Sequence, residues 1–222
     1  MISVIVPTYN EEKLLPLCLE HVRNQQEPCE LIISDGGSTD HTLDIARRYT
    51  DMIVKNEAPN LAGQLNAGAA LAGGEMLLFL HADSILSPSC LSRLRQLPSD
   101  VMGGAFTMFV EGERFFYRVL SVGGNLYCRI SGTYFGDRGI FVRNHTFQEL
   151  NGFTHLPIMT DVDFSRRLKT LGKTMLLPGP VITSGRKFDK ESPWRTLYLI
   201  SYALIAFRLN ADLQKVKEKY YS

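Results

Sequence analysis

The stretch ELIISDGGSTDHTLDIARRY, residues 30–49, holds a short apolar run, a glycine turn and a helix-like pattern in succession. Its first five residues contain the apolar run Leu-Ile-Ile, as in a parallel strand that is buried on both faces. Two glycines then permit a tight turn. The helix-like part opens with three favourable N-cap residues, Ser38, Thr39 and Asp40. The stretch therefore predicts a strand, a turn and a helix.

The same alternation runs through the first half of the chain. Further apolar runs lie at residues 2–6, 52–55 and 76–80, and the segments between them have apolar residues at helical spacing. Alternating strands and helices are typical of an open, doubly wound α/β sheet. Such sheets bind their ligands at the carboxyl ends of the strands. We therefore expect the functional site at that edge.

The second half is less regular. Residues 101–110 alternate like an exposed strand, and Ser87-Pro88 resembles the start of a short helix. Gly172 is expected to close a helix that begins near Thr160. The remaining expectations are helices at 113–130, 193–208 and 210–221, a turn and strand within 136–144, and short strands at 173–179 and 181–184. No repeat or linker divides the chain.

The composition narrows the classes of protein. The 222 residues are 45% hydrophobic, enough for one compact domain with a sizeable core. Lys and Arg (24) nearly balance Asp and Glu (23), so no general field attracts nucleic acid or anionic lipid. We expect no nucleic-acid partner.

The cysteines indicate neither a zinc site nor a disulfide framework, because they form no CxxC pair and lie in apolar segments. The first ten residues lack a basic n-region and resemble a strand, not a signal peptide. These features favour the cytoplasm.

The C-terminal segment 193–221 joins an aromatic-rich apolar half to a basic helix. Its longest apolar stretch is shorter than the roughly 20 residues that cross a bilayer. Such helices can pack on their own domain, pair with a second subunit in a homodimer, or rest on the inner face of a membrane. The sequence leaves these alternatives open.

Polar clusters follow three of the predicted strands: PTYNEE at 7–12, DGGSTD at 35–40 and HADS at 81–84. Asp35 stands where doubly wound folds contact the base or ribose of a nucleotide. The alternative is a tight turn that feeds a helix cap. No GxGxxG follows the first strand, which argues against a dinucleotide fold.

Asp83 is a candidate metal ligand. Mg²⁺ or Mn²⁺ beside a diphosphate is typically held by one or two carboxylates and the phosphate oxygens. His81 lies two residues earlier, on the same face of a strand, so its imidazole could also reach the ion. The alternatives are a loop or N-cap role for Asp83 and a hydrogen-bonded strand end for His81.

Asp161 is a candidate general base. In a helix that begins near Thr160 it shares roughly the inward side of Phe164 and Leu168, where a carboxylate could accept a proton from a hydroxyl. The helix dipole alone can explain one acidic residue in the first turn. Farther on, Arg186 could hold a phosphate, although an exposed basic turn is the alternative.

These motifs, in this order, together with GDRGIFVR and TDVDFSRRL, resemble the landmarks of glycosyltransferase family 2 enzymes with the GT-A fold. More narrowly, FLHADS, GDRGIFV, DVDFSRRLK and ITSGRKF resemble a bacterial branch associated with radical-SAM and seleno-domain gene neighbourhoods. The resemblance implies an α/β GT-A nucleotide-diphospho-sugar transferase fold, with a Rossmann-like, mixed, mostly parallel sheet flanked by helices.

The resemblance also implies roles for individual positions. In such enzymes the first two loops hold the nucleotide, which implies donor contacts for Pro7, Tyr9, Glu11 and Asp35. The metal-binding DxD element matches His81, Ala82 and Asp83. The catalytic aspartate matches Asp161. The loop on the acceptor side matches Gly136, Asp137 and Arg138.

By this resemblance the chain is a metal-dependent, inverting, hexosyltransferase-like enzyme. It would move a sugar from a nucleoside diphosphate sugar, with UDP-sugars favoured, to an acceptor hydroxyl, with Mg²⁺ or Mn²⁺ as cofactor. Residues 1–222 would form one domain, with a donor-binding half at 1–110, a catalytic half at 111–190 and a helical tail at 191–222.

Three positions depart from the family pattern. Gly36 replaces a second acidic residue, His81 the first aspartate of DxD, and Thr160 the usual glutamate before the base. They motivate a rival hypothesis, a degenerate GT-A domain that binds nucleotide or a partner without catalysis. No QxxRW element follows Asp161, so a processive polymer synthase is not expected.

Overall fold

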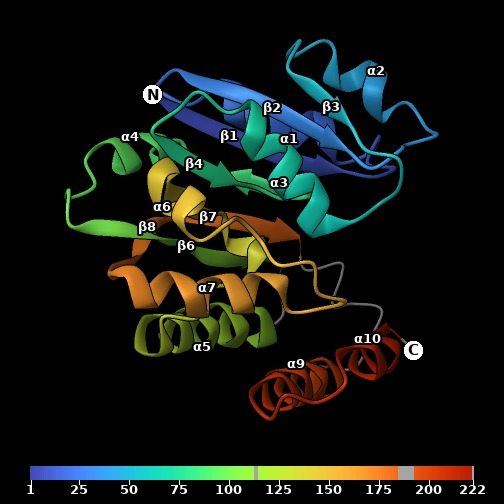
Figure 1. The fold of residues 1–222 in the computed structure, drawn as a ribbon, viewed down its shortest axis with the longest axis vertical. Helices are drawn as coiled ribbons and strands as arrows, with labels where there is room; N and C mark the ends of the chain where they lie inside the picture. The colour runs from blue at the N-terminus through green and yellow to red at the C-terminus, as the bar shows by residue number, and fades with distance from the viewer. Residues whose placement is uncertain (113–114, 185–192, 222) are drawn as a thin grey trace.

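The computed structural model of the chain describes residues 1–112, 115–184 and 193–221. Its strands are β1 (Ile2–Thr8), β2 (Cys29–Asp35), β3 (Ile53–Lys55), β4 (Met76–Phe79), β5 (Ser84–Leu86), β6 (Val101–Glu111), β7 (Ile140–Arg143) and β8 (Lys173–Ser184). Its helices are α1 (Leu15–Arg23), α2 (Thr42–Ala46), α3 (Leu61–Leu71), α4 (Cys90–Arg95), α5 (Phe115–Ser131), α6 (Asn144–Glu149), α7 (Thr160–Leu171), α9 (Pro193–Arg208) and α10 (Leu213–Tyr221), with a 3₁₀ turn η1 (Gly136–Arg138) (Figure 1).

The described strands form one sheet in the order β3-β2-β1-β4-β7-β6-β8-β5. The first four of these are mutually parallel, and every residue of β1 is buried. Strand β7 runs antiparallel to both neighbours, whereas β6 and β8 are parallel. The predicted mixed, mostly parallel α/β sheet is confirmed.

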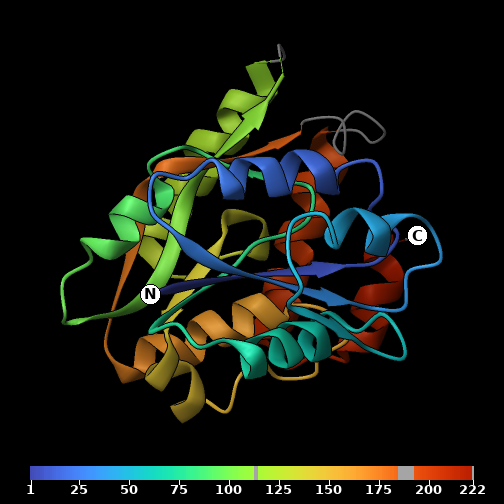
Figure 2. The same cartoon turned by 90° about the horizontal axis from the view of Figure 1, so that it is seen from above.

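Two hydrophobic cores lie on opposite faces of the sheet. Val4 and Val6 of β1 belong to one core, and Ile5 between them belongs to the other, as the period of two requires. Helix α1 covers the first face, and α3 and α7 cover the second (Figure 2). Both faces of the parallel strands are therefore buried, which explains their continuous apolar sequences.

The predicted exposure of residues 101–110 is wrong for most of that strand. β6 lies between β7 and β8, and only its last residues alternate with solvent. Helices α5 and α7 contact β6, and β8, which is one strand where two short ones were expected, pairs along its edge. The end of β6 and the start of α5 project from the body of the molecule (Figure 2).

Two helices begin later than predicted. Of the caps expected for the first, Asp40 accepts the N–H of Thr42 at 3.0 Å, at the start of α2. The hydroxyl of Ser38 donates to Asp35 at 2.5 Å, and α2 starts at Thr42. The hydroxyl of Ser87 donates to the carbonyl of Pro180 at 2.5 Å, and α4 starts at Cys90. The expected end of α7 at Gly172 is confirmed.

The C-terminal helices pack on the rest of the chain through a small apolar cluster. Ala203 and Ala206 of α9 meet Val216 of α10, and Ile158 and Met159, just before α7, pack against them. Packing on the chain's own domain, one of the three alternatives, is therefore present. Of the helices in the described ranges, none is long and apolar enough to cross a membrane.

Candidate functional site

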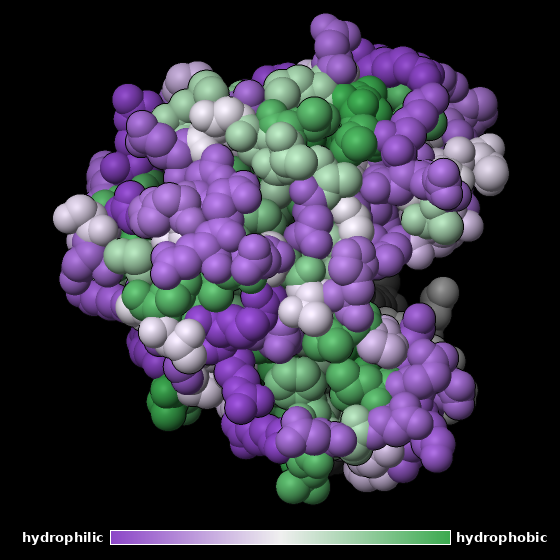
Figure 3. All heavy atoms as spheres, viewed as in Figure 1, coloured by the Kyte–Doolittle hydropathy of each residue, from purple (hydrophilic) through white to green (hydrophobic). Residues whose placement is uncertain are grey.

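The loops after β1 and β2 are tied together at the carboxyl edge of the sheet. The backbone N–H of Gly36 donates to the carbonyl of Thr8 at 2.8 Å. The N–H of Asn10 donates to the Ser38 hydroxyl at 2.9 Å, and the N–H of Glu11 donates to the Thr42 hydroxyl at 2.7 Å. On the same side, a notch separates the part with β1 to β3 from the part with α9 and α10 (Figure 3). The expected convergence of these two loops is confirmed.

The carboxylate of Asp35 organises this edge. It is fully buried and accepts four hydrogen bonds, two at each oxygen. The donors are the hydroxyls of Thr8 and Ser38 and the backbone N–H groups of Gly37 and Ser38. Four bonds fill the acceptor sites of a carboxylate. In this conformation Asp35 fixes the loops that would surround a nucleotide, and its direct contact with a base stays a prediction.

Gln64 of α3 is a second organiser, which the sequence interpretation missed. Its buried amide nitrogen donates to the carbonyls of Thr8 at 2.8 Å and Ser34 at 2.9 Å. Its amide oxygen accepts the N–H of Asn60 at 3.2 Å, while the Asn60 side chain caps α3 through Gly63. Gln64 thus joins the ends of β1 and β2 to the start of α3. The Asn N-cap four residues earlier was the available sequence signal.

The other predicted donor-binding residues differ in exposure. Pro7 is buried within β1, where it pairs with Ser34. Tyr9 is 46% exposed, directly after that strand. Glu11 is half-buried at the start of the following turn.

His81 and Asp83 follow β4 and are both half-buried, with the buried Ala82 between them. The His81 ring lies against Gly136, where an added Cβ would come within 2.6 Å of Nε2. Asp83, together with Glu11, lies close enough to the Cys18 thiol to raise its pKa, although burial is the larger cause.

The metal-binding groups at Asp83 suit a metal ion that binds together with the phosphate groups of the substrate. Among the described residues, no three His, Cys, Asp or Glu side chains gather closely enough to hold an ion. In the same residues, the Asp83 carboxylate accepts one long hydrogen bond, from the Ser84 hydroxyl at 3.4 Å. A hard carboxylate oxygen with spare capacity fits Mg²⁺ or Mn²⁺ whose other ligands are phosphate oxygens and water.

Asp161 lies in the first turn of α7, directly after Met159 in a left-handed conformation (φ 67°) and Thr160. Its Oδ2 accepts the backbone N–H of Gly136 at 2.7 Å, and its Oδ1 accepts the N–H of Val162 at 2.8 Å. Burial raises the pKa of Asp161. The two N–H groups and His81 oppose this rise, and the Asp137 carboxylate adds to it.

Asp161, His81 and Gly136 line a small recess whose other walls are largely apolar. The apolar lining comes from α3, β4, β7 and the segment before α7, and includes Leu61, Phe79, Ile140 and Phe153. The structure thus brings together residues from three of the predicted motifs, which are widely separated in the sequence.

The two residues after Gly136, Asp137 and Arg138, are not among the residues that line this recess. Arg138 is 2% exposed, and its Nη1 donates to Asn125 of α5 at 2.5 Å. One oxygen of Asp137 is buried and, within the described chain, has no hydrogen-bond partner. The acceptor contacts predicted for Asp137 and Arg138 stay predictions. Arg186 lies outside the described residues.

Comparison with known proteins places this site in a family. Residues 3–160 match the family model described as glycosyl transferase family 2. The chain belongs to glycosyltransferase family 2. The match ends just before Asp161, so the role of that residue rests on geometry. The narrower radical-SAM and seleno-domain branch stays a prediction.

A relative of this family 2 chain is the PGL/p-HBAD biosynthesis glycosyltransferase of Mycobacterium tuberculosis, 36% identical over 121 residues. The alignment covers 49% of this chain and 47% of the relative, so the chain spans about half the length of that protein.

Two solved structures show the same fold at low sequence identity. The mannosyltransferase PcManGT of Pyrobaculum calidifontis, in complex with GDP-Man and Mn²⁺, aligns with a TM-score of 0.66 and 23% identity, over 89% of this chain and 60% of that one. TarS of S. aureus, in complex with UDP-GlcNAc, aligns with a TM-score of 0.64 and 18% identity, over 99% and 71%. The fold of the family 2 chain is therefore GT-A.

Proposed function

We propose that this protein is a metal-dependent, inverting glycosyltransferase that moves a sugar from a nucleoside diphosphate sugar to an acceptor hydroxyl. The observation that carries the proposal is the Asp161 carboxylate in the recess beside His81, oriented by the N–H of Gly136 and raised in pKa by burial. Membership of family 2 and the GT-A fold support the same reaction class.

Asp161 acts as the general base. The acceptor oxygen attacks the anomeric carbon as its proton passes to the carboxylate, and the bond from that carbon to the diphosphate breaks with its electron pair on the leaving oxygen. A single in-line displacement inverts the anomeric configuration. A raised pKa brings the carboxylate closer to the working pH, where a base is most effective. The Gly136 N–H fixes its direction, and such positioning contributes to rate.

The donor lies over the loops that Asp35 and Gln64 organise, with Pro7, Tyr9 and Glu11 as its further contacts. The UDP-GlcNAc complex of TarS supports a UDP-sugar, and the GDP-Man complex of PcManGT makes a GDP-sugar the alternative. Asp83 would hold Mg²⁺ or Mn²⁺, with His81 as a neighbouring ligand. When bound, the metal neutralises charge on the leaving diphosphate.

A panel of UDP-, GDP- and dTDP-sugars, each with Mn²⁺ and with a chelator, tests the proposal. Release of nucleoside diphosphate identifies the donor, and the proposal requires Mn²⁺ to increase it. Asp161→Asn should abolish release while leaving nucleotide affinity nearly intact. Asp163→Asn is the matched control, since Asp163 lies in the same turn but pairs with Arg167 at 2.8 Å.

Binding of a nucleotide without release of any sugar across the panel would instead support the rival, a non-catalytic GT-A domain. Equal loss of affinity and turnover in Asp161→Asn would reassign that residue to binding.

A further inference from the structure

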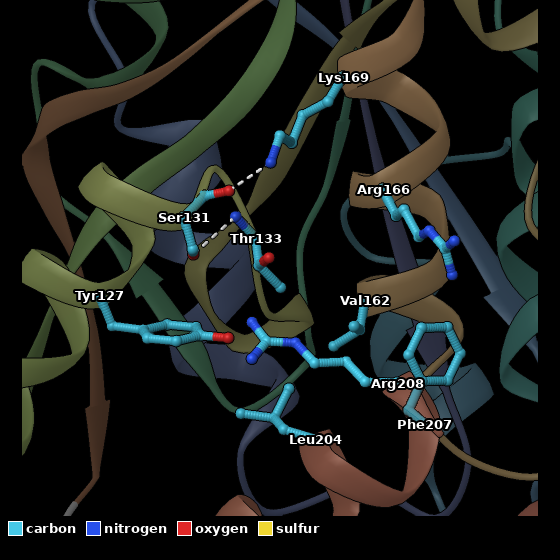
Figure 4. A pocket seen from close by; sticks show the side chains of 9 residues that line it. All are labelled: Tyr127, Ser131, Thr133, Val162, Arg166, Lys169, Leu204, Phe207 and Arg208. Atoms are coloured by element: carbon cyan, nitrogen blue, oxygen red, sulfur yellow. Dashed lines mark hydrogen bonds between the residues drawn. The ribbon is translucent and has the colours of Figure 1, made fainter. Parts of the chain in front are cut away.

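A cavity of about 350 Å³ lies between α5, α7 and α9, on a different face of α7 from Asp161. Figure 4 shows its lining, in which Tyr127 and Arg208 extend toward each other from opposite sides. Arg166 and Lys169 of α7 complete a set of three cationic side chains, and no acidic residue is among the lining residues.

The three cationic side chains are available to bind an anion. No carboxylate in the described part of the chain forms an ion pair with Arg166, Lys169 or Arg208. The Lys169 ammonium donates to the carbonyl of Ser131 at 2.5 Å, which uses one of its three protons. In Figure 4 the Arg166 guanidinium points away from the Arg208 guanidinium and the Lys169 ammonium. Each guanidinium can bind a phosphate in a forked geometry.

Exposed apolar side chains stand beside this cavity. On α5, Leu126 is 56% exposed and Ile130 is 78% exposed, each next to a lining residue. Ile205 of α9 is 56% exposed, and Leu209, directly after that helix, is 75% exposed; in the sequence they follow the lining residues Leu204 and Arg208. The cavity is therefore a basic site with apolar neighbours on two helices.

Helix α5 is apolar on two opposite faces. Its inward face packs through Tyr117, Ser121 and Cys128. Its outward face repeats at helical spacing and is 45% to 78% exposed, through Phe115, Val119, Val122, Leu126 and Ile130. The helix has no acidic residue, and Arg118 and Arg129 are exposed on it. An exposed apolar stripe of this length on the side opposite the buried one is typical of a surface that contacts protein or lipid.

We infer that the outward faces of α5 and α9 lie on a membrane, and that the cavity binds the phosphate of an anionic lipid. Apolar side chains with interspersed cations are the composition of surfaces that lie in the interface of an anionic bilayer. A second copy of the chain docked here would bring like charges together, which disfavours that occupant.

Sedimentation with vesicles, in the absence of donor and metal, tests the binding. Wild-type protein should bind vesicles of phosphatidylcholine mixed with phosphatidylglycerol more tightly than vesicles of phosphatidylcholine alone. Arg166→Gln/Lys169→Gln/Arg208→Gln should lose this preference, with affinity for the mixed vesicles at least about tenfold weaker. Arg47→Gln/Arg48→Gln/Arg95→Gln, at exposed positions directly after α2 and at the end of α4, removes the same charge elsewhere and should keep the preference.

Val122→Gln/Leu126→Gln should weaken binding to both kinds of vesicle. Equal binding by wild type and the cavity variant would overturn the inference. So would binding of inorganic phosphate without binding of vesicles, which indicates a soluble phosphate ligand, or a dimer that the Val122→Gln/Leu126→Gln variant dissociates. Release of sugar to water is measured separately, so failure of the enzyme proposal does not affect this result.

Discussion

The backbone N–H of Gly136 donates to Oδ2 of Asp161 at 2.7 Å, which ties η1 to the first turn of α7. The same glycine lies against the His81 ring, so an added side chain there would displace the imidazole. One backbone group therefore aligns the candidate base and leaves room for the residue at the end of β4. The chemistry of Asp161 depends on this contact and on the charges around it.

The pH dependence of turnover should report the raised pKa of Asp161. Because the carboxylate must be deprotonated to accept a proton, kcat/KM should rise with pH through a pKa above the ordinary value of about 3.9. Asp137 raises that pKa and His81 lowers it. Asp137→Asn should therefore move the acidic limb to lower pH, whereas Asp163→Asn should leave it in place. A shift to higher pH in Asp137→Asn would contradict this assignment.

Replacement of Gln64 should weaken both the fold and the donor site. Gln64→Leu leaves the carbonyls of Thr8 and Ser34 without their shared donor. The loss of such buried bonds costs about 1–3 kcal/mol in the free energy of unfolding. Chemical denaturation measures that loss, and nucleotide affinity should fall with it. Gln148→Leu, at an exposed position of α6, should stay within about 0.5 kcal/mol of wild type.

The parts of the fold that could be predicted are those that local sequence patterns determine. The continuous apolar runs identified β1, β2 and β4 because those strands are largely buried on both faces, and loops that follow parallel strands must meet at one edge. Strand β5 and the buried position of β6 were missed, because they depend on pairing with β8, nearly a hundred residues beyond β5. Periodicity within a short window carries no information about such distant partners.

The residues of the candidate site also divide into those that local sequence patterns predict and those that depend on contacts between distant parts of the chain. Asp83, His81 and Asp161 were predicted because each stands at the end of a strand or in the first turn of a helix. The role of Gln64 and the inward direction of Arg138 were not, because they depend on groups that are close only in space: the backbone carbonyl of Thr8 for Gln64 and the side chain of Asn125 for Arg138. The basic cavity was missed for another reason: Arg166 and Lys169 have the spacing of an ordinary solvated face, and only the approach of α9 adds Arg208.

Two glycine substitutions should have opposite effects on stability. A Cβ on Gly104 of β6 would lie 1.8 Å from the carbonyl oxygen of Met175 in β8, so Gly104→Ala must separate two paired strands. We expect a loss of at least about 3 kcal/mol, measured by denaturant unfolding. On α5, Gly123 has open space around its Cβ position, and Gly123→Ala should add about 0.5–1 kcal/mol through helix propensity. Comparable effects at the two positions would contradict the packing of β6 against β8.

Thiol labelling should distinguish one cysteine from the other three. Cys18, Cys90 and Cys128 are buried, whereas Cys29 is half-buried. Burial raises the pKa of Cys90 to about 12 and that of Cys128 to about 11, and it raises those of Cys18 and Cys29 as well. Because the thiolate is the reactive form, the native protein should label slowly, at Cys29 first, and faster as pH rises.

Cys29→Ser should nearly abolish labelling of the native protein by a disulfide reagent, and all three remaining thiols should react in denaturant. Cys18 is the informative exception, because it donates to the carbonyl of His81 at 3.6 Å beneath the candidate metal site. Labelling of Cys18 at a rate close to that of Cys29 would show that the segment after β4 opens in solution. A nucleotide that binds over this segment should then slow the labelling of Cys18 and leave that of Cys29 unchanged.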